Sequence, residues 1–532
     1  MISNKRILTS IIIIFVIFGL SFGFSAAYFL TDVSGNDTAS SVNLKTANIA
    51  LNLIDGPDVT ISNVGPGATI EKTLVVSNPS GVSFLYGLVW EAVANGFSNQ
   101  NLLTYSVACT SYSDYSDLDT PDDPSECTGV GSQNSPNSTE TQVDIIGSAS
   151  VPAYGAQKYT LTLEVSSDIP AGVIVSFTAT FGIKTLPIYG VTFSNAIAGT
   201  RTDEAEGLTY TVNASTIDSD FDTADIYRDI TEVTDSYGNV FVKIPKFYIK
   251  KTKTAGNVWT YQISKGMHDA SYYLPECFKN QGTSETLDYV LIGKYNASLN
   301  ATKLESKSGS TPLLSTNITN SRTYATNNGA SYQLLDIHTI DMLQALFYVE
   351  FATLDSQTVM AGYTDGSAAA TSGTTNSVTT ASGSPTSNST GAYAMKYRGI
   401  ENLYGNIYQF IDGINMNSDQ AYIAKNPANY AVNVFTGEYI SIGYVNGASG
   451  GYPLEMGYDS NQPYANFPTL ISGGYETSLY KDYYGPAYGG SRTMLFGGWW
   501  TDNINAGITL WYCTDVSDAP SNTGSRLVKK AY

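Results

Sequence analysis

Apolar and polar residues alternate with a period of two over several segments in the first third of the chain. Residues 69–76, 157–165 and 173–181 follow this pattern, and Pro and Gly separate them. A period of two places every second side chain on the same face of a strand. Because such segments recur between turn residues throughout residues 30–186, the pattern predicts a β-sandwich there.

The pattern is different in the rest of the chain. Residues 237–248 alternate as a further strand, whereas residues 337–352 have the spacing of an amphipathic helix, with Asp336 as its expected N-cap. The apolar side chains on one face of that helix are Leu343, Leu346, Phe347 and Phe351. We therefore predict a mainly β protein with some α structure, in which an α+β domain follows the sandwich.

Length and composition divide the chain into parts. A chain of 532 residues is too long for one ordinary domain, and Leu186-Pro187 marks a boundary. We expect an export segment over residues 1–29, the sandwich over 30–186 and a second domain over 187–532. Within the second domain, residues 364–392 are rich in Ser, Thr, Gly and Ala, which predicts a loop or a disordered insertion.

The N-terminus has the pattern of an export signal. Lys5 and Arg6 precede an uncharged stretch that runs from Ile7 to Leu30. A positive segment followed by an apolar one directs a chain into the membrane. A cleaved signal peptide and a retained anchor both fit, and the small residues favour cleavage near Ala26 or Ala27. We therefore expect an exported protein at the cell surface or outside the cell.

Charge and aromatic content limit the choice of partner. The formal net charge is −20, with only 27 Lys and Arg, so nucleic acid and anionic lipid are poor partners. The chain contains 39 Tyr residues. Tyrosine supplies rigid amphipathic contact area on recognition surfaces, and it also fills β-strands. The composition therefore favours a β protein that binds proteins or sugars.

Two of the four cysteines suggest a disulfide, and the pairing of the other two is left open. Cys109 and Cys127 flank an acidic loop, residues 113–126, and are able to close it, whereas nothing in the sequence pairs Cys277 with Cys513. The carboxylates of the acidic loop could gather calcium, but their spacing is not that of an EF-hand, and a solvated loop is the simpler interpretation. No zinc-type spacing occurs, so no metal or other cofactor is predicted.

The first third of the chain resembles a known family. Residues 26–32 lead into 47–53, and residues 63–67 are followed by 73–78, in the pattern of the TasA/camelysin family. The resemblance covers about residues 1–186. It implies an exported, surface-associated β-sandwich, and some members assemble into fibres by strand exchange. An alternative function is therefore that of a structural fibre subunit.

Residues from about 190 to 532 resemble a second family. The motifs lie at residues 199–208, 237–248, 398–413, 496–500 and 524–528. They are similar to the C-type-lectin-like fold of the formylglycine-generating-enzyme and sulfatase-modifying group. That fold also serves phage tail-fibre receptor-binding proteins and the variable proteins of diversity-generating retroelements. The resemblance implies a module that displays a binding surface.

The same resemblance assigns structural roles to several residues. It places Trp500 at a buried core position and Trp499 at a more exposed one. It makes the following residues architectural: Gly405, Asn406, Gly497, Gly498 and Arg526. The enzymes of this group use a pair of reactive cysteines, and Cys513 stands alone in this region. Neither His268 nor His338 lies where a related iron-dependent branch places its ligands, so no enzyme is predicted.

The predicted binding surface lies within residues 473–523. Aromatic side chains serve as anchors at recognition sites, and Asn and Asp add directional hydrogen bonds. The residues predicted to contact a ligand are Tyr483, Tyr484, Trp499, Asp502, Asn503, Asn505, Trp511, Tyr512 and Asp515. The expected ligand is a protein or a carbohydrate on another cell or surface. The resemblance adds the possibility that the retroelement type of diversification varies this segment, which the overall composition leaves open.

Overall fold

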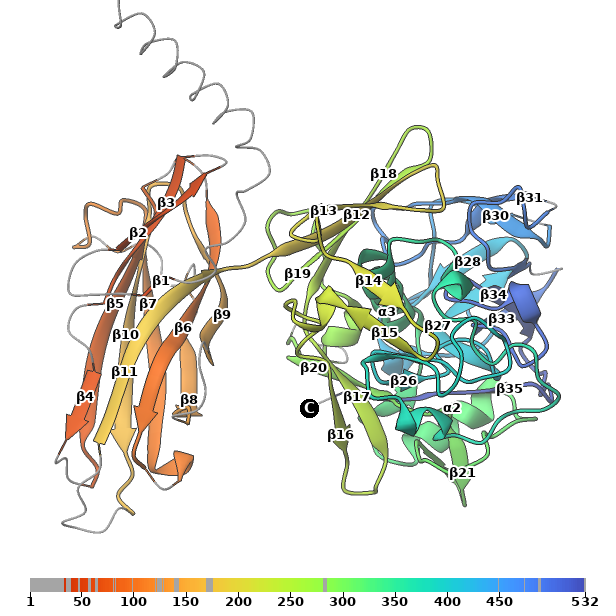
Figure 1. Cartoon of the computed structure of the whole chain (residues 1–532), viewed down its shortest axis with the longest axis horizontal. Coiled ribbons are helices and arrows are strands. Elements are labelled where there is room, and N and C mark those ends of the chain that lie inside the picture. Colours follow the sequence, from red (N-terminus) through yellow and green to blue (C-terminus); the bar gives the residue numbers. More distant parts are fainter. Residues whose placement is uncertain are drawn as a thin grey trace, which may run out of the picture. The chain divides into compact units, whose positions relative to one another are not determined.

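A computed structural model describes residues 33–530, and the chain forms two compact units, 1–186 and 187–532 (Figure 1). The description leaves out residues 35–39, 46–47, 56–58, 63–65, 80, 82, 98, 120, 122–126, 128, 138–142, 169–175, 281–284, 448, 473 and 487–488. The predicted export segment, residues 1–29, lies outside the described part. Within that part, none of the helices combines the length and the apolar character that a bilayer crossing requires.

The first unit consists of two antiparallel sheets. One sheet contains β1 (Val33–Ser34), β4 (Val59–Ser62), β6 (Phe84–Asn95), β9 (Val143–Val151) and β11 (Ser176–Thr185). The other has the order β2 (Ser40–Lys45), β3 (Asn48–Ile54), β5 (Thr69–Ser77), β10 (Ala156–Val165), β7 (Leu103–Tyr112) and β8 (Val130–Asn134). The predicted strands at 69–76 and 157–165 correspond to β5 and β10.

Aromatic side chains from both sheets meet in the core of this unit. Trp90 on β6 is fully buried, and its ring centroid lies 5.2 Å from that of Tyr105 on β7. Phe177 and Phe181 on β11 lie 5.9 Å and 4.9 Å from the same ring. Since β6 and β7 belong to different sheets, these contacts bury apolar area between two layers, as in a sandwich. Cys109 on β7 and Cys127 are joined in a disulfide, with 5.6 Å between their Cα atoms.

The second unit contains several smaller sheets around one large core. The first comprises β12 (Ile188–Ser194), β13 (Thr200–Asp203), β18 (Tyr248–Thr254) and β19 (Val258–Ser264). The second comprises β14 (Tyr210–Val212), β15 (Thr216–Ser219), β24 (Ser382–Gly383), β25 (Lys396–Tyr397) and β26 (Ile400–Glu401). The third has the order β16 (Thr231–Thr234), β17 (Val240–Pro245), β20 (Tyr289–Gly293), β36 (Leu527–Lys530) and β23 (Tyr332–Leu334).

The sheet that carries most of the predicted site lies near the C-terminus in sequence. Its order is β29 (Ile440–Ser441), β28 (Gln420–Ile423), β27 (Tyr408–Asn417), β33 (Ser491–Phe496), β34 (Trp511–Asp515) and β32 (Tyr484–Gly485), and β35 (Thr523–Gly524) also pairs with β27. Two further hairpins are β21–β22 (Ser298–Asn300, Lys303–Glu305) and β30–β31 (Tyr452–Met456, Pro468–Ser472). The predicted fold class, mainly β with some α, is confirmed.

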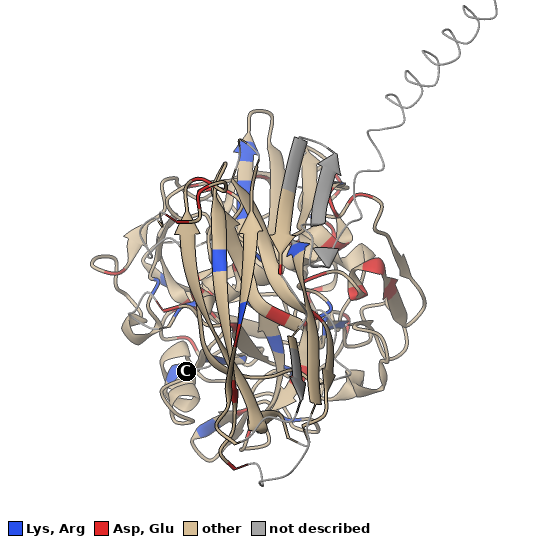
Figure 2. Cartoon of the chain, turned by 90° about the vertical axis from the view of Figure 1, so that its left-hand side faces the viewer, with Lys and Arg blue, Asp and Glu red and all other residues tan. Residues whose placement is uncertain are grey.

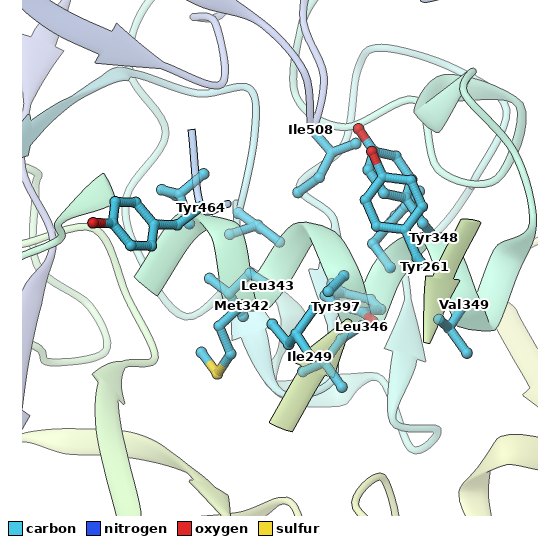
Figure 3. Close-up of a cluster of buried hydrophobic side chains, with 14 of the residues drawn as sticks. Ile249, Tyr261, Met342, Leu343, Leu346, Tyr348, Val349, Tyr397, Tyr464 and Ile508 are labelled. Atoms are coloured by element: carbon cyan, nitrogen blue, oxygen red, sulfur yellow. The ribbon is translucent and has the colours of Figure 1, made fainter. Parts of the chain in front are cut away.

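The predicted helix is present as α3 (Ile337–Phe351), and the Asp336 side chain caps it by accepting from the Thr339 N–H. All its residues are buried, so the helix is not amphipathic as predicted but lies inside the core (Figure 3). Its polar side chains need partners there because burial of an unpaired polar group is costly. Glu350, for example, accepts two hydrogen bonds from Arg398, and Gln344 donates to the Ile508 carbonyl at 2.8 Å.

The Ser/Thr/Gly-rich segment 364–392 is mostly loop, interrupted by a 3-10 helix (Thr374–Ser377) and the short strand β24, and it is held in place by hydrogen bonds. Glu401 accepts from the backbone N–H groups of Gly373 and Thr375, each at 2.8 Å. Asn406 accepts from the N–H of Ala370 at 2.7 Å. Two side chains of the 398–413 motif thus hold a segment that has few apolar residues of its own, which is why composition alone did not predict its order.

Candidate binding surface

Tyr408 on β27 lies at the centre of the candidate surface. Its ring centroid is 5.6 Å from that of Tyr512 on β34, and its hydroxyl forms a hydrogen bond with the Asp502 carboxylate. Burial raises the pKa of Tyr408 far above its usual value, and it also raises the pKa of the Asp502 carboxyl. Tyr408 was not among the predicted site residues, although it lies in the motif at residues 398–413. Asp502 and Tyr512, which Tyr408 contacts, are each about 100 positions away from it in sequence.

The loop after β33 brings Trp499 next to this centre. The Trp499 N–H donates to the Asp502 carboxylate at 3.1 Å, and the Asp502 N–H donates back to the Trp499 carbonyl at 3.1 Å. The rings of Trp499 and Trp500 meet edge to face, 4.7 Å apart. Both rings are half-buried, so Trp500 is not the fully buried core residue that the sequence predicted. Each indole therefore presents part of its surface to solvent.

A second aromatic group adjoins Asn505. Tyr452 on β30 makes edge contacts with Tyr483 at 5.7 Å and with Tyr475 at 5.4 Å. The Tyr452 hydroxyl donates to the Asn505 side chain at 2.5 Å, and the Tyr483 N–H donates to the Asn505 carbonyl at 2.9 Å. Sequence reasoning missed Tyr452, and no signal marked it, because tyrosines occur throughout the chain.

Hydrogen bonds with Gln357 and Thr364 hold the backbone that carries these side chains. Gln357 donates to the carbonyls of Asn503 and Ala506 at 2.6 and 2.7 Å. The Asn503 N–H donates to the Thr364 carbonyl at 2.9 Å, and Asn503 adopts a left-handed φ of 50°. Asn tolerates this conformation better than most residues. These bonds use backbone groups of Asn503 and Ala506, so part of the loop's shape does not depend on its exposed side chains, although the Asn503 side chain also donates to the Thr501 carbonyl at 2.9 Å.

One glycine sets the position of Tyr512. A Cβ added to Gly485 on β32 would lie 2.2 Å from the Tyr512 ring, so the ring covers the backbone of the neighbouring strand. Any larger residue at position 485 would displace the ring. Tyr512 remains 40% exposed, and Ile504 in the adjacent loop is 51% exposed. These two side chains give the surface its most accessible apolar area.

The structure therefore brings together six of the nine predicted residues. We call Tyr483, Trp499, Asp502, Asn503, Asn505 and Tyr512 the aromatic surface. Tyr484 and Trp511 are 0% and 2% exposed and belong to the core, so a ligand cannot contact them directly and their prediction as contact residues was wrong. Asp515 lies at the opposite end of β34, where it forms an ion pair with Arg492 at 2.6 Å.

The other residues considered for catalysis or metal binding lie in structural positions. His338 is fully buried and its Nε2 lies 2.9 Å from the Ala424 carbonyl. Burial raises the pKa of the Cys513 thiol to about 12, which disfavours a nucleophilic thiolate. In the described part of the chain, no three His, Cys, Asp or Glu side chains come together in a way that could hold a metal ion. Of the acidic loop, Asp122, Asp123 and Glu126 lie outside the described residues.

Comparison with known proteins finds similarity among solved structures alone. No family model and no curated protein matches the sequence. A solved structure, "Major Tropism Determinant U1 Variant", is similar over 64% of this chain and 72% of its own, with 13% sequence identity and a TM-score of 0.22. A TM-score this low does not establish a shared fold, so the function has to be argued from the residues of this chain.

Proposed function

We propose that this chain is an exported surface protein that recognises a protein or a carbohydrate through the aromatic surface of residues 187–532. The observation that carries the proposal is the gathering of Tyr483, Trp499 and Tyr512, all partly exposed, around Tyr408. Aromatic side chains supply most of the binding energy at recognition sites, and carboxyl and amide groups between them give direction.

Charge supports a neutral or cationic ligand rather than a polyanion. Formal net charge is −20, and Figure 2 shows Lys and Arg positions scattered singly in that view rather than gathered in a patch. A phosphate backbone would be repelled by such a molecule at long range. A protein or sugar that offers apolar faces and hydroxyl or amide groups fits the aromatic surface better.

The test is a binding screen with the full chain on glycan arrays and on whole cells. A variant with Trp499, Asn503 and Tyr512 changed to Ala is expected to lose roughly 30-fold in affinity, which corresponds to about 2 kcal/mol of hot-spot energy. Tyr237→Ala is the matched control, because Tyr237 is a 55% exposed tyrosine of the same unit outside the aromatic surface. Equal binding by all three proteins would contradict the proposal.

Diversification of the segment that carries the aromatic surface is a further part of the proposal. The positions concerned are Asp502, Asn503, Asn505, Tyr512 and Asp515. It is supported by the hydrogen bonds of Gln357 and Thr364, which hold part of the loop through the backbone groups of Asn503 and Ala506. A reverse-transcriptase gene beside this gene, with a near-copy of its 3′ end, would support the proposal, and a locus without them would contradict it.

A fibre subunit remains the second candidate. Among the strands that the structure describes, β8 and β9 of the first unit each pair on one side only. Unpaired strand edges are able to accept a strand from another chain. Electron microscopy of cells that produce the protein distinguishes the two functions, because filaments are expected only for the fibre subunit.

A further inference from the structure

A buried lysine occupies a core position of β18. Buried and more exposed residues alternate along this strand, and Lys251 follows Ile249 on the buried side. Its side chain is only 1% exposed. Lysine is rarely buried to this degree unless its charge is paired, so its neighbours explain why it is here.

Three reactive groups meet at Lys251. Its Nζ contacts the carboxylate of Asp341 on α3 and donates to the Oδ1 of Asn466 at 2.6 Å. The Tyr273 hydroxyl donates to the other carboxylate oxygen of Asp341 at 2.7 Å. The Asp341 side chain is fully buried. The amine therefore contacts both a fixed, fully buried carboxylate and a half-buried carboxamide.

The surroundings favour the nucleophilic form of the amine. The Tyr261 ring centroid lies 5.6 Å from Nζ, and Figure 3 shows Tyr261 and Ile249 beside α3 in the apolar core. Burial lowers the pKa of Lys251, and the charge of Asp341 opposes that shift in part. A neutral lysine amine is the species that attacks a carbonyl carbon.

We propose that Lys251 and Asn466 form an intramolecular amide bond, with Asp341 as the group that carries the proton. Asp341 accepts a proton from the Lys251 ammonium, and the free electron pair of Nζ attacks Cγ of Asn466. The Cγ–Nδ2 bond then breaks, and the leaving nitrogen takes both the proton held by Asp341 and a second proton from Nζ. Lys251 and Asn466 become one amide, the nitrogen is released as ammonium, Asp341 is restored as a carboxylate, and no oxidant or reductant is consumed.

The roles follow from what each residue contacts. Asn466 offers a neutral carboxamide, whose Nδ2 also donates to the Gly457 carbonyl at 3.2 Å. Asp341 is held by Tyr273 from its far side, which suits a residue that exchanges a proton and keeps its place. The bond would join β18 to the segment before β31 across 215 residues of sequence. Such a link survives unfolding and limits the unfolded chain, as a disulfide does.

The test is mass spectrometry of the full chain after reduction and denaturation. The protein is first folded and is then reduced, denatured and digested. The digest is expected to contain one linked peptide with Lys251 and Asn466, about 17 Da lighter than the sum of its two parts because ammonia has left. Lys251→Met and Asp341→Ala are expected to abolish the linked peptide. Lys253→Met is the matched control, because Lys253 is on the same strand and donates to Glu455 at 2.5 Å instead.

The wild-type peptide decides the question even where the Lys251 and Asp341 variants fail to fold. Unlinked peptides from the folded wild-type protein would overturn the proposal and leave these residues as a buried ion pair with an amide partner. A peptide that joins Lys251 to Asp341, about 18 Da lighter through loss of water, would overturn the choice of Asn466. The inference does not depend on the proposed binding function.

Discussion

Replacing Arg526 with Met is expected to lower the free energy of unfolding of residues 187–532 by about 3–5 kcal/mol. The Arg526 side chain is fully buried, and all five of its N–H groups are used. They donate to the Gln409 side chain and to the carbonyls of Gly293, Lys294, Glu401 and Asn402, at 2.7–3.1 Å. Methionine fills a similar volume but removes all five hydrogen bonds, although the Lys294 and Asn402 carbonyls keep another donor, the Glu401 N–H and the Gln409 side chain respectively.

Denaturant unfolding followed by tryptophan fluorescence measures this loss. Four of the five tryptophans, all except Trp90, lie in residues 187–532, so the signal reports mainly on that unit. Arg492→Met is the matched control, because the ion pair of Arg492 with Asp515 is partly exposed and is expected to contribute less than about 1 kcal/mol. A change for Arg526→Met as small as that of the control would show that the five hydrogen bonds are not needed.

Asp482 is expected to make the free energy of unfolding depend on pH, and this is the second large effect. Its carboxylate is fully buried and accepts from the N–H and hydroxyl of Thr509, at 2.8 and 2.7 Å, and from the Ser356 hydroxyl. Burial raises the pKa of Asp482 to about 7. The pKa of Asp482 in the folded protein therefore lies above its unfolded value of about 3.9. Protonation of this carboxyl adds to the free energy of unfolding, and the whole contribution is present below about pH 3.9. It is lost as pH rises towards 7.

The loss between pH 4 and pH 8 is on the order of 4 kcal/mol. Asp482→Asn has no proton to lose, so its free energy of unfolding is expected to fall less than that of the wild type over this range. The half-buried Glu204, whose pKa desolvation also raises to about 7, adds a slope of the same sign, and the difference between the two proteins removes it. Equal pH profiles for wild type and Asp482→Asn would contradict the assignment.

Local patterns predicted much of the fold. The alternation that predicted β5 and β10 and the capped helix α3 depend on neighbouring residues, and the structure contains all three. Helix α2 (Ile318–Thr326) was missed because its sequence is polar and rich in Thr, which has low helix propensity. A distant contact stabilises it instead, since Arg322 forms a bidentate ion pair with Asp412 on β27 at 2.8 Å.

The candidate site was predictable as a region but not residue by residue. Tyr484 and Trp511 have the same chemistry as Tyr483 and Tyr512, and alternation along the strands decides which face the core. The strands β32 and β34 are too short and too rich in aromatics for a hydrophobic pattern to show that alternation. The contribution of Tyr408 depends on a sheet pairing between distant segments, which a linear sequence does not display.

The position of β36 also determines when the second unit is able to fold. This strand lies between β20 and β23, and Val290 pairs with Lys530, which is 530 − 290 = 240 residues away. The sheet therefore stays incomplete until residues 527–530 are available, however much of the chain precedes them. Pairing over such distances makes folding slow. We expect the sandwich of residues 30–186 to fold first and the binding unit to remain open longest, and hydrogen exchange during refolding would measure that order.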